Sequence, residues 1–487
     1  MNRYRKANDA IHVPGHLVRA VSNTKKRRSL WISAAAAATA MAVFAAIFLW
    51  SAPAPQEEKP NNFPLNTPLI PVVSAAEVLA QPTYPTMNPA PDFSGEWSEE
   101  DYDRWRETRR AQWQQRPEDD SALDDFYLET AREFLLNSDG ENALYSPLNL
   151  YLGLGMLAEV TDGQTREQIL ELLNCDSVEE LRKFVSALWN VNYCDDGAVT
   201  SLLASSLWLR DDMDYRMDTL GTLADSYYAS SHRGTMGSPE YTTMFRNWMN
   251  ENTGNLLADQ IDDLELDAQT VLALVSTIYF NAGWAERFSS DSTAPDIFHA
   301  PDGDVTVNFL HQSGERFYYR GDGFGAVDLP LAESGRMWIL LPDEGNSVDD
   351  LLEGNALSLL TGREEWLDQK HLTVNLSLPK FDISCQIELE EPMKKLGITD
   401  VFSESTADFS PLCPDSSGLA LSDALHGARV MIDEEGCTGA AYTLFTIKAT
   451  GGYIQQEEMD FIADRPFLFA VTGPDNQILF LGVVNQP

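Results

Sequence analysis

Residues 434–456 constrain the fold of this chain more than any other stretch, because they combine the pattern of a strand with the flanks of a loop. Between Cys437 and Ile447 there is no charged residue and no proline, and the composition favours a β-strand. Alternate residues divide into a small-to-apolar face and a more polar face, as in a strand with one face against a core. The flanks, Glu-Glu-Gly at 434–436 and two glycines at 451–452, are typical of a surface loop. Two interpretations follow: an ordinary buried strand, or a segment that is a loop in one state and a strand in another.

The length and charge of the chain exclude several classes of function. A chain of 487 residues can form one large domain with appended segments. Its net charge is −41, and the residues after position 28 include 26 basic and 74 acidic ones, so nucleic acid is disfavoured as a partner because its phosphates would be repelled. The five cysteines are too few for a disulfide framework, and no Cys or His spacing indicates a metal site. No glycine-rich phosphate loop lies between a strand and a helix, and we expect no cofactor.

The first 119 residues divide into four segments of different composition. Residues 1–28 are basic, and residues 29–51 contain a 21-residue run without a charge, which is long enough to cross a membrane. The cations before this run predict a single-pass anchor in the cell membrane, with the following domain extracellular. A signal peptide, and hence a secreted protein, is the alternative. Residues 52–92 contain ten prolines and predict a semi-rigid linker, and residues 93–119 predict a charged, Trp-containing surface helix without an assigned function.

Residues 120–487 have the pattern of a large domain. Ser146 is a candidate N-cap, with Pro147 at the first helical position, for a nearly all-apolar helix over residues 149–159. Residues 272–284 form an almost continuous apolar run, which predicts a central strand buried on both faces. The domain therefore contains both buried helices and buried strands.

Several separate motifs in this domain resemble those of the serpins, the serine protease inhibitor family, and occur in the family's order. They are Ser146-Pro147-Leu148, Pro379-Lys380-Phe381, Leu396-Gly397 with Phe402, the Glu-Glu-Gly at 434–436 and the Ala-Asp-Arg-Pro-Phe-Leu-Phe at 463–469. The resemblance covers about residues 122–487. It implies an α+β serpin fold with a large, mostly antiparallel central sheet, further sheets, about eight or nine helices and an exposed reactive-centre loop. It implies an inhibitor rather than an enzyme, and the chain has no Gly-x-Ser-x-Gly elbow.

The resemblance places the hinge of the reactive-centre loop at the start of the opening stretch. The hinge residues are Glu434, Glu435, Gly436, Cys437, Thr438, Gly439, Ala440, Ala441, Tyr442 and Thr443. The alternate residues from Cys437 to Thr443 are small and uncharged, so they can enter a sheet without the desolvation of a charge. Gly439 stands where the family favours Ala, which weakens a strand. This hinge predicts a working inhibitor; the alternative is a non-inhibitory serpin that acts as a cell-surface binding or scaffold protein.

Cys437 within the hinge has two interpretations. A thiol that the solvent reaches in the uncleaved form could act as a redox switch, and we expect Cys437 to be reachable. We favour the simpler interpretation, in which Cys437 is a small apolar residue suited to insertion.

The bond that a protease would attack lies further along the loop. Counting forward from Gly436 in the family manner places it between Thr450 and Gly451. The loop is longer than in familiar members, and counting back from Pro466 gives a later site around residues 452–455. Small residues favour an elastase-like protease, and a subtilisin-like protease is a further candidate. Other residues that could precede the cleaved bond are Lys448, Ala449 and Tyr453. We expect a monomer.

The resemblance also places a polar cluster under the central sheet, where the sheet has to part for a new strand. Its members are Ser146, Asn149, Ser276 and His426, and Trp284 lies at the top of the gap. Buried polar groups must satisfy one another, so such a cluster can hold one closed arrangement until strand insertion replaces it. The family usually has Ser at the position of Asn149 and Asn at that of Ser276. The alternative interpretation is a helix cap and an ordinary satisfied histidine.

Overall fold

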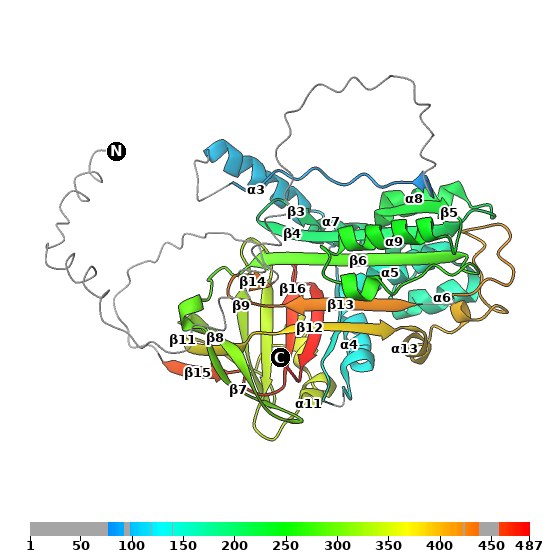
Figure 1. Ribbon diagram of the computed structural model, residues 1–487. Coiled ribbons are helices and arrows are strands. Elements are labelled where there is room, and N and C mark those ends of the chain that lie inside the picture. The colour runs from blue at the N-terminus through cyan, green and yellow to red at the C-terminus, as the bar shows by residue number, and fades with distance from the viewer. Residues whose placement is uncertain (1–75, 92–97, 118, 139, 422–423, 438–456) are drawn as a thin grey trace, which may run out of the picture. The chain divides into compact units, whose positions relative to one another are not determined.

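The structure is a computed structural model that describes residues 76–91, 98–117, 119–138, 140–421, 424–437 and 457–487 (Figure 1). These residues form an α+β fold with eleven α-helices, α3 to α13. The resemblance implied about eight or nine helices for the serpin domain. Of the eleven, α3 lies before that domain, and four others have only four to six residues.

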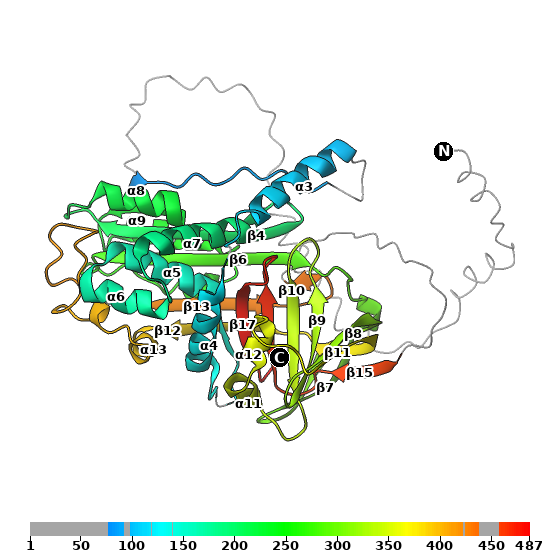
Figure 2. The same cartoon turned by 180° about the vertical axis from the view of Figure 1, so that it is seen from behind.

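The helices lie on both faces of the main sheet. Figure 1 shows α9 over one face, and Figure 2 shows α5, α6 and α7 over the other. The bounds of the helices are α3 Glu99–Trp113, α4 Ser121–Leu135, α5 Pro147–Val160, α6 Gly163–Leu172, α7 Val178–Asn192, α8 Met217–Tyr227, α9 Pro239–Asn252, α10 Ala258–Ile261, α11 Val348–Glu353, α12 Ala356–Leu360 and α13 Glu390–Lys395, with short 3-10 turns at Ser290–Ser292 and Asp400–Phe402.

The main sheet has the strand order β1-β5-β4-β6-β14, and β3 pairs with the start of β4. Every pairing in it is antiparallel except that of β4 with β5, as predicted for a mostly antiparallel sheet. The bounds of these strands are β1 Ala76–Ala80, β3 Cys194–Asp195, β4 Val199–Arg210, β5 Ala229–Gly234, β6 Leu272–Gly283 and β14 Gly436–Cys437. The predicted central strand is β6, the longest partner of β4.

A nine-stranded second sheet and a separate two-stranded sheet complete the fold. The second sheet has the order β15-β11-β8-β9-β10-β16-β17-β2, with β7 paired to β8, and the small sheet consists of β12 and β13. The bounds are β2 Ala143–Tyr145, β7 Ala294–Ala300, β8 Gly303–Arg320, β9 Phe324–Pro330, β10 Arg336–Pro342, β11 Asp368–Pro379, β12 Asp382–Glu388, β13 Leu425–Met431, β15 Glu458–Ile462, β16 Phe467–Thr472 and β17 Ile478–Val484.

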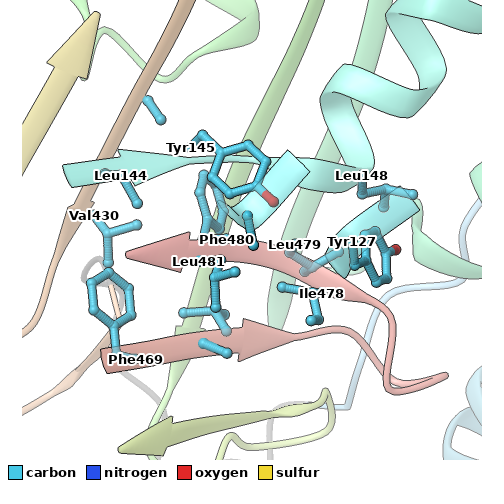
Figure 3. Close-up of a cluster of buried hydrophobic side chains, with 14 of the residues drawn as sticks. Tyr127, Leu144, Tyr145, Leu148, Val430, Phe469, Ile478, Leu479, Phe480 and Leu481 are labelled. Atoms are coloured by element: carbon cyan, nitrogen blue, oxygen red, sulfur yellow. The ribbon is translucent and has the colours of Figure 1, made fainter. Parts of the chain in front are cut away.

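The start of α5 confirms the predicted capping. The Ser146 side chain accepts a hydrogen bond from the backbone N–H of Asn149, and Pro147 occupies the first turn. Nearly every side chain of α5 is buried, because the helix lies between the main sheet and the second sheet. Figure 3 shows part of this core, with Tyr145 beside Phe480 and Leu148 beside Tyr127.

The predicted linker of residues 52–92 differs from the structure near its end. Residues 76–80 form β1, which adds an edge strand to the main sheet by pairing with β5. Further along, the ring of Tyr84 stacks on those of Trp189 and Tyr228, and the N–H of Ala90 donates to the carbonyl of Asp196. The surface helix predicted in residues 93–119 is α3. The predicted membrane span, residues 29–51, lies outside the described residues, and no described helix is long and apolar enough to cross a membrane.

Candidate functional site

The main sheet is interrupted between β6 and β13, which lie side by side in both views (Figures 1 and 2). Within the described strands, β13 forms its ladder with β12 and not with β6. Most of the side chains from Leu272 to Tyr279 on β6 are only half-buried, whereas Phe280 to Gly283 are buried. The half-buried part of β6, residues 272–279, therefore has backbone groups on one side that another strand could pair with.

Two cavities lie along this gap, one on each face of the sheet. A cavity of about 450 Å³ lies on the side of α9 and α10, and one of about 110 Å³ lies on the side of α5 and α13. They share lining residues from three elements, namely Asn149, Leu274, Ser276, Leu425 and His426. The space between β6 and β13 thus reaches both faces of the sheet at the position of the predicted polar cluster.

One end of the gap is already occupied by β14. After β13 the chain turns at residues 432–437, with the N–H of Asp433 donating to the carbonyl of Gly436. Cys437 pairs with Ala282 of β6 on one side and with Ile432, just after β13, on the other. Gly436 fits here because a Cβ would come within 2.4 Å of the carbonyl oxygen of Ala282. The first residues of the predicted hinge therefore lie between β6 and the end of β13, as the first residues of an inserted strand would.

The structure brings together the four predicted residues of the polar cluster. The backbone N–H of Ser146 donates to Nε2 of His426 over 2.9 Å, and the Ser146 hydroxyl donates to the carbonyl of Leu479. His426 is 6% exposed, and burial lowers its pKa to about 4. The ring is therefore neutral at physiological pH, which leaves Nε2 free to accept this hydrogen bond.

Asn149 and Ser276 connect α5 to β6 across the cluster. The Asn149 amide donates to the carbonyl of Ser276 over 3.1 Å, and the Ser276 hydroxyl donates to the Asn149 side-chain oxygen. The family usually has Ser at position 149 and Asn at position 276, and this chain has the two exchanged. The longer side chain therefore comes from α5 and the shorter one from β6, and the two still form a hydrogen-bonded pair. The side chains of Asn149 and Ser276 that face the gap are thus satisfied by each other rather than by a strand.

An ion pair fixes the start of the hinge. Glu434 accepts hydrogen bonds from Lys380 over 2.6 Å and from Thr293 over 2.7 Å. The ammonium of Lys380 holds the pKa of Glu434 below its ordinary value, and Thr293 acts in the same direction. Lys380 belongs to the Pro-Lys-Phe motif, but the sequence showed no role for it, because its partner is 54 positions away. The spacing gave no signal of this pair.

Trp284 directly follows β6 and contacts the same turn. Its indole N–H donates to the carbonyl of Asp433 over 2.8 Å, and its backbone N–H donates to the carbonyl of Glu435. The Glu435 carboxylate pairs with Arg287 over 2.6 Å. The turn before β14 is therefore attached to the segment that follows β6.

The expectation that Cys437 is reachable is wrong. The residue is 3% exposed, and burial raises the pKa of its thiol to about 12. Its sequence neighbours suggested a loop, but the pairings with Ala282 and Ile432 cover it. A buried, protonated thiol agrees with the simpler interpretation, a small residue suited to a strand.

The rest of the predicted hinge and the predicted cleavage sites lie outside the described residues. These are Thr438, Gly439, Ala440, Ala441, Tyr442, Thr443, Lys448, Ala449, Thr450, Gly451 and Tyr453. The described chain resumes at Glu457 and enters β15, which pairs in parallel with β11 of the second sheet. The two ends of the stretch are thus held by different sheets.

Comparisons with known proteins give one consistent result. Residues 121–487 match the family described as "Serpin (serine protease inhibitor)". Serpin-ZX of Arabidopsis thaliana is 27% identical over 365 residues, which cover 72% of this chain and 93% of the relative. Plasminogen activator inhibitor 1 of Sus scrofa is 26% identical, with 74% and 91% covered. The crystal structure of a thermophilic serpin, tengpin, in its native state superposes with a TM-score of 0.66 at 26% identity, covering 76% of this chain and 96% of tengpin.

Proposed function

Because the chain belongs to the serpin family, whose members are protease inhibitors and not enzymes, we propose that it traps a serine protease by inserting its cleaved loop into the main sheet. The observation that carries this proposal is the position of Cys437 between Ala282 and Ile432 at one end of the gap between β6 and β13. The next residues of the chain can continue this strand along β6 without a change in direction.

The proposed reaction begins as ordinary proteolysis. The serine hydroxyl of the protease attacks the carbonyl carbon of a loop bond, an ester forms, and the new amino terminus leaves. Insertion of the loop then adds a strand to the sheet, and serpin loop insertion is a known case of this kind of strand addition. If insertion is faster than hydrolysis of the ester, the protease is displaced while it is still attached.

The gap is suited to such a strand in two respects. The half-buried part of β6 presents unpaired backbone groups on one side, and β13 borders the other side. The lining between them is largely apolar and is kept in place by the network of Asn149, Ser276 and His426. An inserting strand would satisfy the backbone groups and fill the two cavities.

The target that we propose is an elastase-like serine protease, because small residues precede the Thr450–Gly451 bond. We also propose that the inhibitory domain is displayed at a cell surface. The basic residues 1–28 and the uncharged run in residues 29–51 support an N-terminal anchor. Alkaline extraction of membranes from the source cells would leave an anchored protein in the pellet and release a secreted one.

The test is to mix the full-length chain with pancreatic elastase, trypsin, chymotrypsin or subtilisin and to run denaturing gels. We expect a band at the summed mass with elastase that survives boiling, and mass spectrometry of the released C-terminal peptide would identify the cleaved bond. The matched control is Thr443→Arg, which places a charge on the inserting face and should give cleavage without the band. Clean cleavage of the unmodified chain by all four proteases would contradict inhibition and favour a binding or scaffold role.

A further inference from the structure

The segment from Arg104 to Arg116, which covers most of α3 and the turn after it, carries a concentration of positive charge that is unusual for this protein. Five of the 34 basic residues of the chain lie between Arg104 and Arg116, with one acidic residue, Glu107, among them. The whole chain has a net charge of −41. The helix also lies before residues 121–487, so the family comparison assigns it no role.

Four exposed residues of this segment form a ridge, which we define as Arg106, Arg110, Trp113 and Arg116. The first three follow one another at intervals of four and three positions, which places them on one face of the helix. All four side chains are exposed to solvent, and the exposed fraction of Trp113 is 38%. Among the described residues, none of the three guanidinium groups forms an ion pair. Two are instead held against aromatic rings, Arg106 over Tyr102 and Arg116 over Trp113.

The neighbouring face of α3, about 100° around the helix from the ridge, docks firmly on the domain. Trp105 is 3% exposed, and its indole N–H donates to the carboxylate of Asp196 over 2.8 Å. Gln112 donates to the carbonyls of Asn190 and Tyr193 at the end of α7. The Arg109 guanidinium donates to the carbonyl of Glu333 over 2.7 Å. The ridge is therefore held in a fixed orientation.

The docking site of α3 lies at the end of the main sheet where the hinge begins. Asp196 bonds to Val199, which pairs with Ala282, and Ala282 in turn pairs with Cys437. Two strand spacings, roughly 10 Å, thus separate Val199 from Cys437. The turn that contains Glu333 lies at the same end, because the N–H of Ala332 donates to the carbonyl of Gly283. A folded protease is at least about 30 Å across, so one that is held at this end would cover the surface next to the hinge.

We propose that the ridge is an accessory docking surface for the target protease and contacts an acidic patch beside the active site of that protease. This rests on the proposed inhibitory function and specifies its partner. Arg and Trp are enriched at the centres of protein interfaces. At physiological salt, charges more than about 8 Å away are largely screened, so the local arginines rather than the acidic body determine what docks beside them. The ridge speeds encounter with the protease and leaves loop insertion unchanged.

The experiment compares two charge reversals in the full-length chain. Arg110→Glu changes the ridge, and Lys183→Glu makes the same change in charge at an exposed position of α7, seven residues before Asn190, whose carbonyl accepts from Gln112 of α3. The second-order rate constant of covalent complex formation is measured with whichever of elastase, trypsin, chymotrypsin and subtilisin is trapped fastest. We expect Arg110→Glu to lower this rate constant about fivefold at 50 mM NaCl and less than about twofold at 500 mM, with Lys183→Glu close to the unmodified chain. The number of inhibitor molecules consumed per protease should not change.

The outcomes separate this inference from the proposed function. Absence of a covalent complex with all four proteases would contradict inhibition itself. A complex that forms at the same rate with both variants, or faster with Arg110→Glu, would overturn the docking surface and leave inhibition in place. In that case the ridge would have to serve another anionic partner.

Discussion

At the scale of single residues, the buried polar groups beside the gap have the clearest consequences. His426 is neutral because it is buried, and its Nε2 accepts a backbone hydrogen bond that a protonated ring could not accept. Glu434 depends on a partner in a distant part of the chain. His426 lies on β13 beside the gap and Glu434 lies in the turn that follows β13, so each should influence how readily the gap widens.

Stability should fall with decreasing pH because of His426. Its pKa is about 4 in the folded protein, against an ordinary value near 6.5, so between these values only the unfolded chain gains the proton. The free energy of unfolding then rises with pH across this window, and the total loss from pH 6.5 to 4 is on the order of 3 kcal/mol. Denaturant unfolding from pH 4.5 to 7.5 would measure it. The variant His426→Asn is the control, and the same pH slope in both proteins would contradict the assignment.

The Lys380–Glu434 ion pair should slow the spontaneous loss of the uncleaved state. Glu434→Gln removes the ion pair between Lys380 and Glu434, and the side chain of Glu434 is only 19% exposed. We therefore expect the free-energy barrier to widening the gap to fall by about 1 kcal/mol. The half-life of inhibitory activity on mild heating should therefore shorten about fivefold. Glu435→Gln is the matched control, because the side chain of Glu435 is 49% exposed and its pair with Arg287 is better screened. Equal half-lives for the two variants would argue against a special role for Glu434.

At the scale of elements, the sequence predicted those features that depend on local pattern. The apolar run of β6, the Ser-Pro start of α5 and the helix α3 are all present. It could not predict β1, because five residues in a proline-rich segment carry too little pattern and the strand depends on the free edge of β5. It also missed the burial of Cys437, because β14 consists of only two residues and is defined by distant partners.

Docking of α3 should depend on Trp105. Trp105→Ala removes a buried indole and its hydrogen bond to Asp196, and we expect it to destabilise the docked helix by about 3–5 kcal/mol. Hydrogen exchange should then show faster exchange throughout α3, with β6 unchanged. Trp113→Ala, which removes an exposed ring from the same helix, is the control and should leave exchange as it was. Equal protection of α3 in the two variants would show that Trp105 does not hold it.

At the scale of the whole molecule, the gap between β6 and β13 means that the main sheet lacks a strand that it has room for. If the proposed function is right, we expect the uncleaved protein to be held by a barrier to rearrangement rather than by lowest free energy. A strand as long as β6, with 12 residues, would add on the order of ten backbone hydrogen bonds at about 1 kcal/mol each.

Cleavage of the loop should accordingly raise the thermal stability. With about 1.3 °C gained per kcal/mol for a domain of this size, we expect the Tm to rise by about 13 °C after the loop is cut. Differential scanning calorimetry before and after limited proteolysis would measure the shift. Thr443→Arg, cut at the same bond, should show a smaller rise, and an unchanged Tm in the unmodified chain would mean that the loop does not insert.

The pairing of β1 also fixes the end of the main sheet at which the preceding part of the chain enters the domain. Ala76 lies opposite Gly234 at the Arg210 end of β4, whereas Cys437 lies near Val199 at the other end. These ends are separated by the 12 residues of β4, or about 40 Å. A pull on the chain before residue 76 is therefore applied at the end of the main sheet opposite to Cys437, the last described residue of the hinge. If the chain is tethered to a surface from that end, the start of the hinge faces outward, where a large protease can approach without collision with the support.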